Sequence, residues 1–311
     1  MKDYGYTDKL KGPYLNMAKF KIDNPILKAY YKFGPVIARN MPARKNTIKE
    51  TIILPGENNN PINCIVFSAD NLDENAPTIV YFHGGGFYIG TNPVCMMVAG
   101  YLAENLRCKV FMPEYRTSFK HKFPTPVEDC YSVTKELALN PDKYGVKADK
   151  LGVYGDSAGG CLASAVCLMA RDRGEFKLAF QMLIYPVTDY LMQGESFKLF
   201  PDCTWSTNNN IQMWDTYFGG KVPQKIDYAS PLHAASHENL PEAYIEPQGI
   251  DCLRDDGILY HEKLVKAGVK SELNIIEGSY HGFELEFKNP FTQLILKYRV
   301  NKIRDLTRTA K

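Results

Sequence analysis

Gly155-Asp156-Ser157-Ala158-Gly159 decides the fold of this chain, because it joins two segments of different periodicity. Residues 151–154 before it are apolar and strand-like, whereas residues 158–170 after it are small and have apolar residues at helical spacing. A turn this tight strains its central residue and leaves no room for side chains at positions 155 and 159. Backbone strain of this kind is typical of active sites. The stretch therefore predicts a nucleophilic serine at position 157, the alternative being an ordinary glycine-rich turn.

Length and composition limit the classes of protein to which this chain can belong. The chain has 311 residues, with 45% hydrophobic and 23% charged residues, which are values of a globular protein with one large domain or two small ones. The formal net charge is only +2, which argues against a nucleic-acid partner. The charge is uneven, since residues 1–50 hold 11 Lys and Arg but only 4 Asp and Glu.

The sequence shows no signal for membrane insertion or secretion. Residues 1–24 mix lysines with aspartates and have no apolar core of a signal peptide, and no run of 18 apolar residues occurs. The eight cysteines lie mostly in apolar segments and form no C-x-x-C pair. This pattern favours buried free thiols in a reducing compartment, so we expect a cytoplasmic enzyme.

Most of the chain alternates between strand-like and helix-like segments, which predicts an α/β fold. We expect strands at 51–54, 62–68, 78–82, 109–112, 150–154, 178–185, 243–246 and 273–276. We expect helices at 93–107, 126–139, 157–171, 255–267 and 291–308. An opening hairpin followed by repeated strand–helix units indicates a mostly parallel sheet covered by helices on both faces.

Two segments depart from this alternation. Residues 1–45 have an amphipathic helical pattern interrupted at Gly34-Pro35, and residues 190–228 hold both tryptophans and several other aromatic residues. We interpret 46–189 and 229–311 as the α/β core, 1–45 as N-terminal cap helices and 190–228 as a cap insertion whose aromatic residues wall a pocket. The alternatives are a basic arm lying on the domain and a peripheral helical hairpin.

His83-Gly84-Gly85-Gly86 follows a predicted strand and fits an oxyanion-binding loop. Consecutive glycines allow backbone N–H groups to approach a developing negative charge closely. A phosphate-binding loop is the competing idea, but the G-x-x-x-x-G-K-[ST] pattern is absent. We expect His83 itself to be a structural hydrogen-bonding residue.

A nucleophilic serine needs a histidine base, and four histidines follow position 157. His281 lies in a loop just past a predicted strand, where α/β sheets place their reactive groups. His261 falls in a helical pattern rich in Lys and Glu. His233 and His237 have the spacing of a metal pair but lack a third ligand, so we expect no metal site.

The orienting acid is expected between the serine and the histidine. Asp251 follows the predicted strand 243–246 directly and is the preferred candidate. Asp255 and Asp256 fall in a first helical turn, where carboxylates often only complement the helix dipole. Asp189, at the end of the preceding strand, is a further alternative.

Together these motifs resemble the hormone-sensitive-lipase-like family of esterases (bacterial family IV), over residues 47–308. The resemblance rests on His83–Gly86, Gly155–Gly159, residues 251–257 and His281-Gly-Phe283 in this order. It implies an α/β-hydrolase fold with an eight-stranded sheet and a helical cap built from an N-terminal segment and an insertion after the sixth strand. It also implies that the oxyanion donors are the N–H groups of Gly85, Gly86 and Ala158.

The chain departs from the family pattern in two places. The family usually continues its Tyr-Arg into Leu-Ala-Pro-Glu, whereas Tyr115-Arg116 runs here into Thr117-Ser-Phe-Lys-His121. The proline usually found after the acid is Cys252. The first departure changes a loop near the site and so bears on substrate preference.

These observations predict a serine carboxylesterase that hydrolyses short-chain acyl esters through Ser157, His281 and Asp251. The expected partner is a small-molecule ester, with no metal or organic cofactor, and an open sheet edge would allow a homodimer. Three alternatives stay open: an amidase or peptidase with the same triad, a transacylase, and a non-catalytic receptor with a hydrolase fold.

Overall fold

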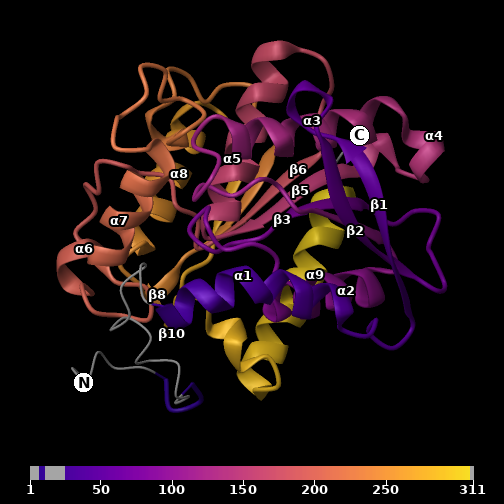
Figure 1. The fold of residues 1–311 in the computed structure, drawn as a ribbon, viewed down its shortest axis with the longest axis horizontal. Coiled ribbons are helices and arrows are strands. Elements are labelled where there is room, and N and C mark those ends of the chain that lie inside the picture. The colour runs from indigo at the N-terminus through magenta and orange to yellow at the C-terminus, as the bar shows by residue number, and fades with distance from the viewer. Residues whose placement is uncertain (1–6, 11–24, 309–311) are drawn as a thin grey trace.

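A twisted eight-stranded sheet forms the centre of the protein, in a computed structural model that describes residues 7–10 and 25–308 (Figure 1). Its strand order is β1-β2-β4-β3-β5-β6-β7-β9, in which β2 is antiparallel to both neighbours and all other pairs are parallel. The strands are β1 (Thr47–Pro55), β2 (Pro61–Ala69), β3 (Thr78–Phe82), β4 (Lys109–Pro113), β5 (Leu151–Asp156), β6 (Phe180–Ile184), β7 (Glu242–Glu246) and β9 (Ser271–Leu273). The predicted mostly parallel, eight-stranded α/β-hydrolase sheet is thus confirmed.

Helices cover both faces of this sheet. The helices are α1 (Pro25–Asn40), α2 (Pro93–Leu106), α3 (Thr125–Leu139), α4 (Pro141–Tyr144), α5 (Ala158–Arg173), α6 (Ser196–Leu199), α7 (Thr207–Phe218), α8 (Arg254–Lys266) and α9 (Pro290–Arg308). Helices α3, α5 and α8 share one buried apolar cluster with the sheet, and α2 and α9 share the other. Two cores separated by the sheet explain why the central strands are apolar on both faces.

Strand β3 shows how the sequence builds both cores. Val80 and Phe82 pack into the cluster with α3 and α5, whereas Ile79 and Tyr81 pack into the cluster with α2 and α9. Side chains alternate between the faces of a sheet, so a continuous apolar run is required here.

The expected strand at 273–276 is wrong. The main sheet ends with β9 at Leu273, and the chain then forms β10 (Ile276–Tyr280), which pairs in parallel with β8 (Gln248–Ile250) in a separate two-stranded sheet. Asn274 makes the transition, since its backbone N–H still donates to Ile245 while its side chain donates to the Tyr244 hydroxyl.

The expected interruption at Gly34-Pro35 is also wrong, because α1 continues through Pro35. Proline removes one helical hydrogen bond but does not forbid a helix that packing supports. Pro35 packs against Gly90 so closely that a Cβ at position 90 would lie 2.8 Å from Pro35 Cγ. Of the rest of the expected N-terminal segment 1–45, residues 1–6 and 11–24 lie outside the described residues, and residues 7–10 and 41–45 are not helical.

The segment 190–228 contains α6 and α7 and packs into the core. The Tyr217 ring stacks on Phe87 with 3.8 Å between centroids, and Trp214 packs against the same phenylalanine at 5.8 Å. Tyr217 and Trp214 therefore attach this segment to the loop that follows β3.

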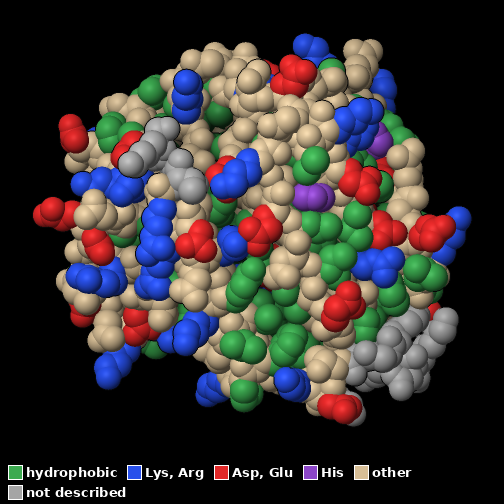
Figure 2. Space-filling model, turned by 180° about the vertical axis from the view of Figure 1, so that it is seen from behind, with side chains coloured by type: hydrophobic (Ala, Val, Ile, Leu, Met, Phe, Trp, Pro, Cys, Tyr) green, Lys and Arg blue, Asp and Glu red, His purple; other side chains and the backbone are tan. Residues whose placement is uncertain are grey.

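The surface mixes charges of both signs. Figure 2 shows acidic and basic side chains interspersed over the face that it presents, as expected from a net charge of +2. None of the helices within the described residues has the length and apolar character needed to cross a bilayer.

A buried ion network joins α9 to the sheet. Arg299, fully buried, contacts Glu246 at the end of β7 at 2.6 Å and Glu284 at 2.6 Å. Glu284 also accepts a hydrogen bond of 2.7 Å from the Tyr185 hydroxyl. One cation thus compensates two carboxylates that are almost inaccessible to water.

Substitution of Arg299 by methionine should destabilise the protein by about 3–5 kcal/mol, because it leaves two buried carboxylates without their cation. Urea denaturation would measure the loss. Arg308→Met at the exposed end of the same helix is the control, and we expect it to change stability by less than about 0.5 kcal/mol. Equal stability of the Arg299 and Arg308 variants would contradict this role of the network.

Candidate active site

Ser157 lies in a strained turn between β5 and α5. Its backbone has φ 55° and ψ −122°, a conformation that L-residues rarely adopt. A Cβ at Gly155 would lie 2.1 Å from the Gly159 carbonyl oxygen, and one at Gly159 would lie 1.9 Å from the Phe82 carbonyl oxygen. Glycine is therefore required on both sides of the serine, for the steric reason predicted from the sequence.

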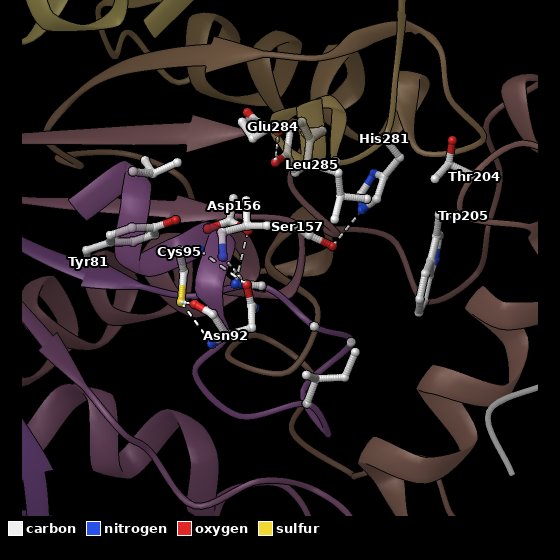
Figure 3. A pocket seen from close by; sticks show the side chains of 18 of the residues that line it. Tyr81, Asn92, Cys95, Asp156, Ser157, Thr204, Trp205, His281, Glu284 and Leu285 are labelled. Carbon is white, nitrogen blue, oxygen red and sulfur yellow. Dashed lines mark hydrogen bonds between the residues drawn. The ribbon is translucent and has the colours of Figure 1, made fainter. Parts of the chain in front are cut away.

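His281 and Asp251 form a hydrogen-bonded chain with this serine. His281 Nδ1 donates to Asp251 Oδ2 at 2.7 Å, which leaves Nε2 to accept the Ser157 hydroxyl at 2.9 Å (Figure 3). The other oxygen of Asp251 accepts the Leu253 N–H at 3.0 Å. Asp251 is fully buried and His281 is 8% exposed, so water competes little for these bonds.

The small parallel sheet explains how two distant segments meet. Tyr280 of β10 pairs with Ile250 of β8, so the next residue of each strand, His281 and Asp251, emerges at the same edge. The carboxyl ends of parallel strands are where α/β proteins place their reactive groups.

The alternative acids are bound elsewhere. Asp189 accepts His233 Nε2 at 2.6 Å, and Asp256 accepts the backbone N–H groups of Thr188 and Asp189 at 2.9 and 3.0 Å. Asp255 binds the N–H of Ser196. None of these carboxylates contacts His281 in the described part of the chain.

The other histidines also have separate partners. His261 Nδ1 lies 2.8 Å from the Ser271 hydroxyl, and His237 Nε2 donates to the Pro231 carbonyl at 2.8 Å. Within residues 7–10 and 25–308, no group of three or more His, Cys, Asp or Glu side chains could hold a metal ion.

The glycine loop after β3 lies beside the serine. Gly85 and Gly86 have φ values of 115° and 58°, which require glycine at the first position and favour it at the second. The N–H groups of Gly85, Gly86 and Ala158 have no acceptor among the described residues. Gly84 N–H donates to Asp156 Oδ2 at 3.1 Å and so holds the loop against the turn that carries Ser157.

His83 has a structural position, as expected. Its ring is fully buried, stacks on Tyr115 at 4.4 Å and has Nδ1 2.8 Å from the Gly84 carbonyl oxygen. Burial lowers the pKa of His83 to about 4, so the ring is neutral at neutral pH.

A cavity of about 190 Å³ opens onto Ser157. Figure 3 shows Tyr81, Asn92 and Cys95 on one side of the serine and His281, Thr204 and Trp205 on the other. Among the described aromatic residues of the segment 190–228, Trp205 is the one that lines this cavity. Of the aromatic residues predicted to wall the pocket, this segment thus contributes a single ring.

Tyr185 is a cavity residue that sequence reasoning missed. It follows β6 directly with φ 35°, an unfavourable value for a tyrosine, and its ring centroid lies 4.6 Å from that of His281. Its place at the end of a predicted strand was a usable signal, because side chains at the carboxyl ends of parallel strands face the site.

The two departures from the family pattern have different surroundings. Thr117, Phe119, Lys120 and His121 line a separate groove of about 660 Å³ together with Pro35 of α1, not the cavity at Ser157. The thiol of Cys252, in contrast, donates to the Trp205 carbonyl oxygen at 3.2 Å and so touches the wall of the cavity.

Comparison with known proteins agrees with the fold and the motifs. Residues 79–285 match a family described by the alpha/beta hydrolase fold, and the chain belongs to this family. The esterase LipI of Mycobacterium tuberculosis is 32% identical over 210 residues, which span 67% of this chain and 66% of LipI. The carboxylic ester hydrolase LipN of the same organism is 32% identical over 67% of this chain and 57% of LipN. The match thus spans less than two thirds of the length of each of these two relatives.

Solved structures extend the similarity over nearly the whole chain. A bacterial heroin esterase has a TM-score of 0.84 and 30% identity, covering 96% of this chain and 95% of that one. A hyperthermophilic esterase from Pyrobaculum calidifontis has a TM-score of 0.81 and 32% identity, covering 93% and 95%. These four similar proteins are named esterases or carboxylic ester hydrolases, and the family resemblance expected from the motifs is confirmed.

We expect the buried carboxyl of Asp156 to make the free energy of unfolding depend on pH. Burial raises the pKa of its carboxyl to about 6 from an ordinary value near 3.8. A carboxyl that binds its proton more tightly when folded stabilises the protein below pH 4, and this contribution is lost as the pH rises through 6.

Asp156→Asn removes this titration and retains an oxygen acceptor for Gly84 N–H. The free energy of unfolding of the variant, minus that of the wild type, should therefore increase by up to about 3 kcal/mol between pH 4 and pH 7. Urea denaturation at several pH values would test this. A difference that stays constant across this range would show that the pKa is not raised.

Proposed function

We propose that the protein is a serine carboxylesterase for short-chain acyl esters, with Ser157 as nucleophile, His281 as base and Asp251 as orienting acid. The hydrogen-bonded chain from Ser157 Oγ through His281 to Asp251, at 2.9 and 2.7 Å, is the observation that carries the proposal. Esterase names among similar proteins support the reaction class.

The proposed reaction uses these groups in two halves. His281 Nε2 takes the proton of Ser157 as Oγ forms a bond to the ester carbonyl carbon, and the imidazolium is stabilised by Asp251. The carbonyl oxygen then bears negative charge, which the N–H groups of Gly85, Gly86 and Ala158 would stabilise. When this intermediate collapses, the alcohol leaves with the proton from His281. Water, activated by the same histidine, then hydrolyses the acyl-enzyme and releases the acid.

The size of the cavity supports a short acyl group. Its volume of about 190 Å³ has to hold the acyl chain and part of the alcohol. Tyr185 and Tyr81 are rigid rings along its wall, so it has little freedom to lengthen. We propose that acetyl to butyryl esters fit and that long acyl chains do not.

An amide substrate is the second candidate. An arylacetamide deacetylase from Bos taurus is 29% identical in an alignment that covers 66% of this chain and 67% of that protein. The same serine, histidine and acid can cleave amides, because His281 would protonate the leaving amine.

The domain division and compartment belong to this proposal. Residues 46–189 and 229–311 would form the hydrolase core, with 1–45 and 190–228 as cap segments. Trp205 in the cavity wall supports a cap role for the second segment. Eight buried free cysteines support a reducing compartment, and thus a cytoplasmic location.

Ser157→Ala should lower kcat for p-nitrophenyl acetate by at least about 10⁴-fold, because the nucleophile is lost while the fold is kept. Asp251→Asn should lower it by about 10⁴-fold through the wrong histidine tautomer. Circular dichroism would verify that both variants are folded. Substantial turnover by Ser157→Ala would refute the assignment.

In wild-type protein, we expect kcat/KM for p-nitrophenyl esters to decrease steeply from butyrate to octanoate and palmitate, because the cavity is short. Initial rates at substrate concentrations below KM would measure this series. Equal rates for acetate and palmitate would contradict a size-limited cavity. Absence of turnover for every ester would direct attention to aryl amides and then to a ligand-binding role.

A further inference from the structure

The proposed reaction fixes which side of Ser157 receives the alcohol. His281 Nε2 must deliver its proton to the leaving oxygen, so this oxygen has to lie within hydrogen-bond distance of the imidazole. The acyl substituent then points to the other side of the carbonyl carbon. In Figure 3, Trp205 and Thr204 lie on the side of His281, whereas Tyr81, Asn92 and Cys95 lie on the opposite side of Ser157. The leaving-group side is therefore walled by the segment 190–228.

Trp205 spans the gap between the histidine and the glycine loop. Its ring centroid lies 6.0 Å from that of His281 with 34° between the planes. At the other end, a Cβ placed at Gly86 would lie 3.1 Å from Trp205 Cη2. An alcohol leaving from Ser157 therefore meets a flat aromatic surface at the edge of the cavity.

The position of this ring is fixed by buried partners. Trp205 Nε1 donates to Asn210 Oδ1 at 3.2 Å, and Asn210 is fully buried at the start of α7. The Trp205 carbonyl accepts the thiol of Cys252 at 3.2 Å, and Cys252 is the neighbour of Asp251. The Cys252 carbonyl in turn accepts the Ser196 hydroxyl at 2.6 Å. Hydrogen bonds on both the side chain and the backbone hold the ring in one orientation, so it can act as a rigid template.

We propose that Trp205 determines the specificity for the leaving alcohol, favouring flat aromatic alcohols over saturated ring alcohols of the same size. This inference rests on the proposed esterase function. A flat ring can stack on the indole or contact it edge to face, whereas a puckered ring makes fewer close contacts with it. The acyl preference, in contrast, is set on the other side of Ser157 and does not depend on this residue.

Benzyl acetate and cyclohexylmethyl acetate are a suitable pair for the test. Both are primary acetates of similar size, and both give the same acetyl-enzyme, so a difference in kcat/KM reports acylation and leaving-group recognition. Release of acetate would be followed in a pH-stat. The wild type should prefer benzyl acetate, and Trp205→Ala should reduce the ratio of the two kcat/KM values by about 10-fold, the aromatic-pair contribution of about 1.4 kcal/mol.

Two controls keep the test decisive. Trp205→Phe retains a flat ring and should keep the benzyl preference within about 3-fold of the wild type. This variant still tests the inference if Trp205→Ala folds poorly. The ratio of kcat/KM for p-nitrophenyl acetate and butyrate, which varies only the acyl group, should stay within about 2-fold of the wild-type value in both variants.

Each outcome has a defined meaning. A wild-type enzyme that hydrolyses both acetates without preferring benzyl, or a benzyl preference that survives in Trp205→Ala, would overturn this inference and leave the esterase function intact. A changed acetate-to-butyrate ratio with an unchanged benzyl ratio would also overturn it, because Trp205 would then wall the acyl side. A wild-type protein inactive on every acetate would instead refute the proposed function itself.

Discussion

The backbone of Ser157 is the constraint on which the site depends. A residue at φ 55° and ψ −122° persists only where its neighbours hold it. Here the close approach of Gly155 to Gly159, and of Gly159 to the end of β3, leaves no alternative path for the chain. Because β5 lies between β3 and β6, the same turn brings the glycine loop to one side of the serine and Tyr185 to the other. The central position of one strand thus assembles three parts of the cavity.

The histidine side of the site depends on a second, smaller set of contacts. The parallel pair β8 and β10 brings Asp251 and His281 to one edge, and the ion network of Arg299 includes Glu284, three residues after His281. Arg299 holds Glu284, Glu284 accepts the Tyr185 hydroxyl, and the Tyr185 ring packs against His281. A buried charge in α9 is therefore linked to the orientation of the His281 ring through two intervening side chains.

Much of this arrangement could be predicted from the sequence, and the exceptions have physical causes. The strands and helices of the core follow from apolar periodicity, and the glycines around Ser157 follow from sterics. The strand at 273–276 was misplaced because Leu273 and Ile276 are both apolar, although Asn274 lets the chain change sheets between them. Trp205 could not be told apart from Trp214 by composition, since only packing decides which ring faces the cavity and which faces Phe87.

The buried thiols have a practical consequence for labelling the segment 190–228. All eight cysteines are buried, and burial raises the pKa of the Cys64, Cys161 and Cys252 thiols, among others, so little thiolate is present to react with labels at neutral pH. A cysteine introduced at an exposed position of this segment, such as Leu191, would be the accessible thiol of the folded protein. Fluorophores or spin labels could then report movement of this segment in the otherwise natural sequence, without first removing the cysteines that fill the core.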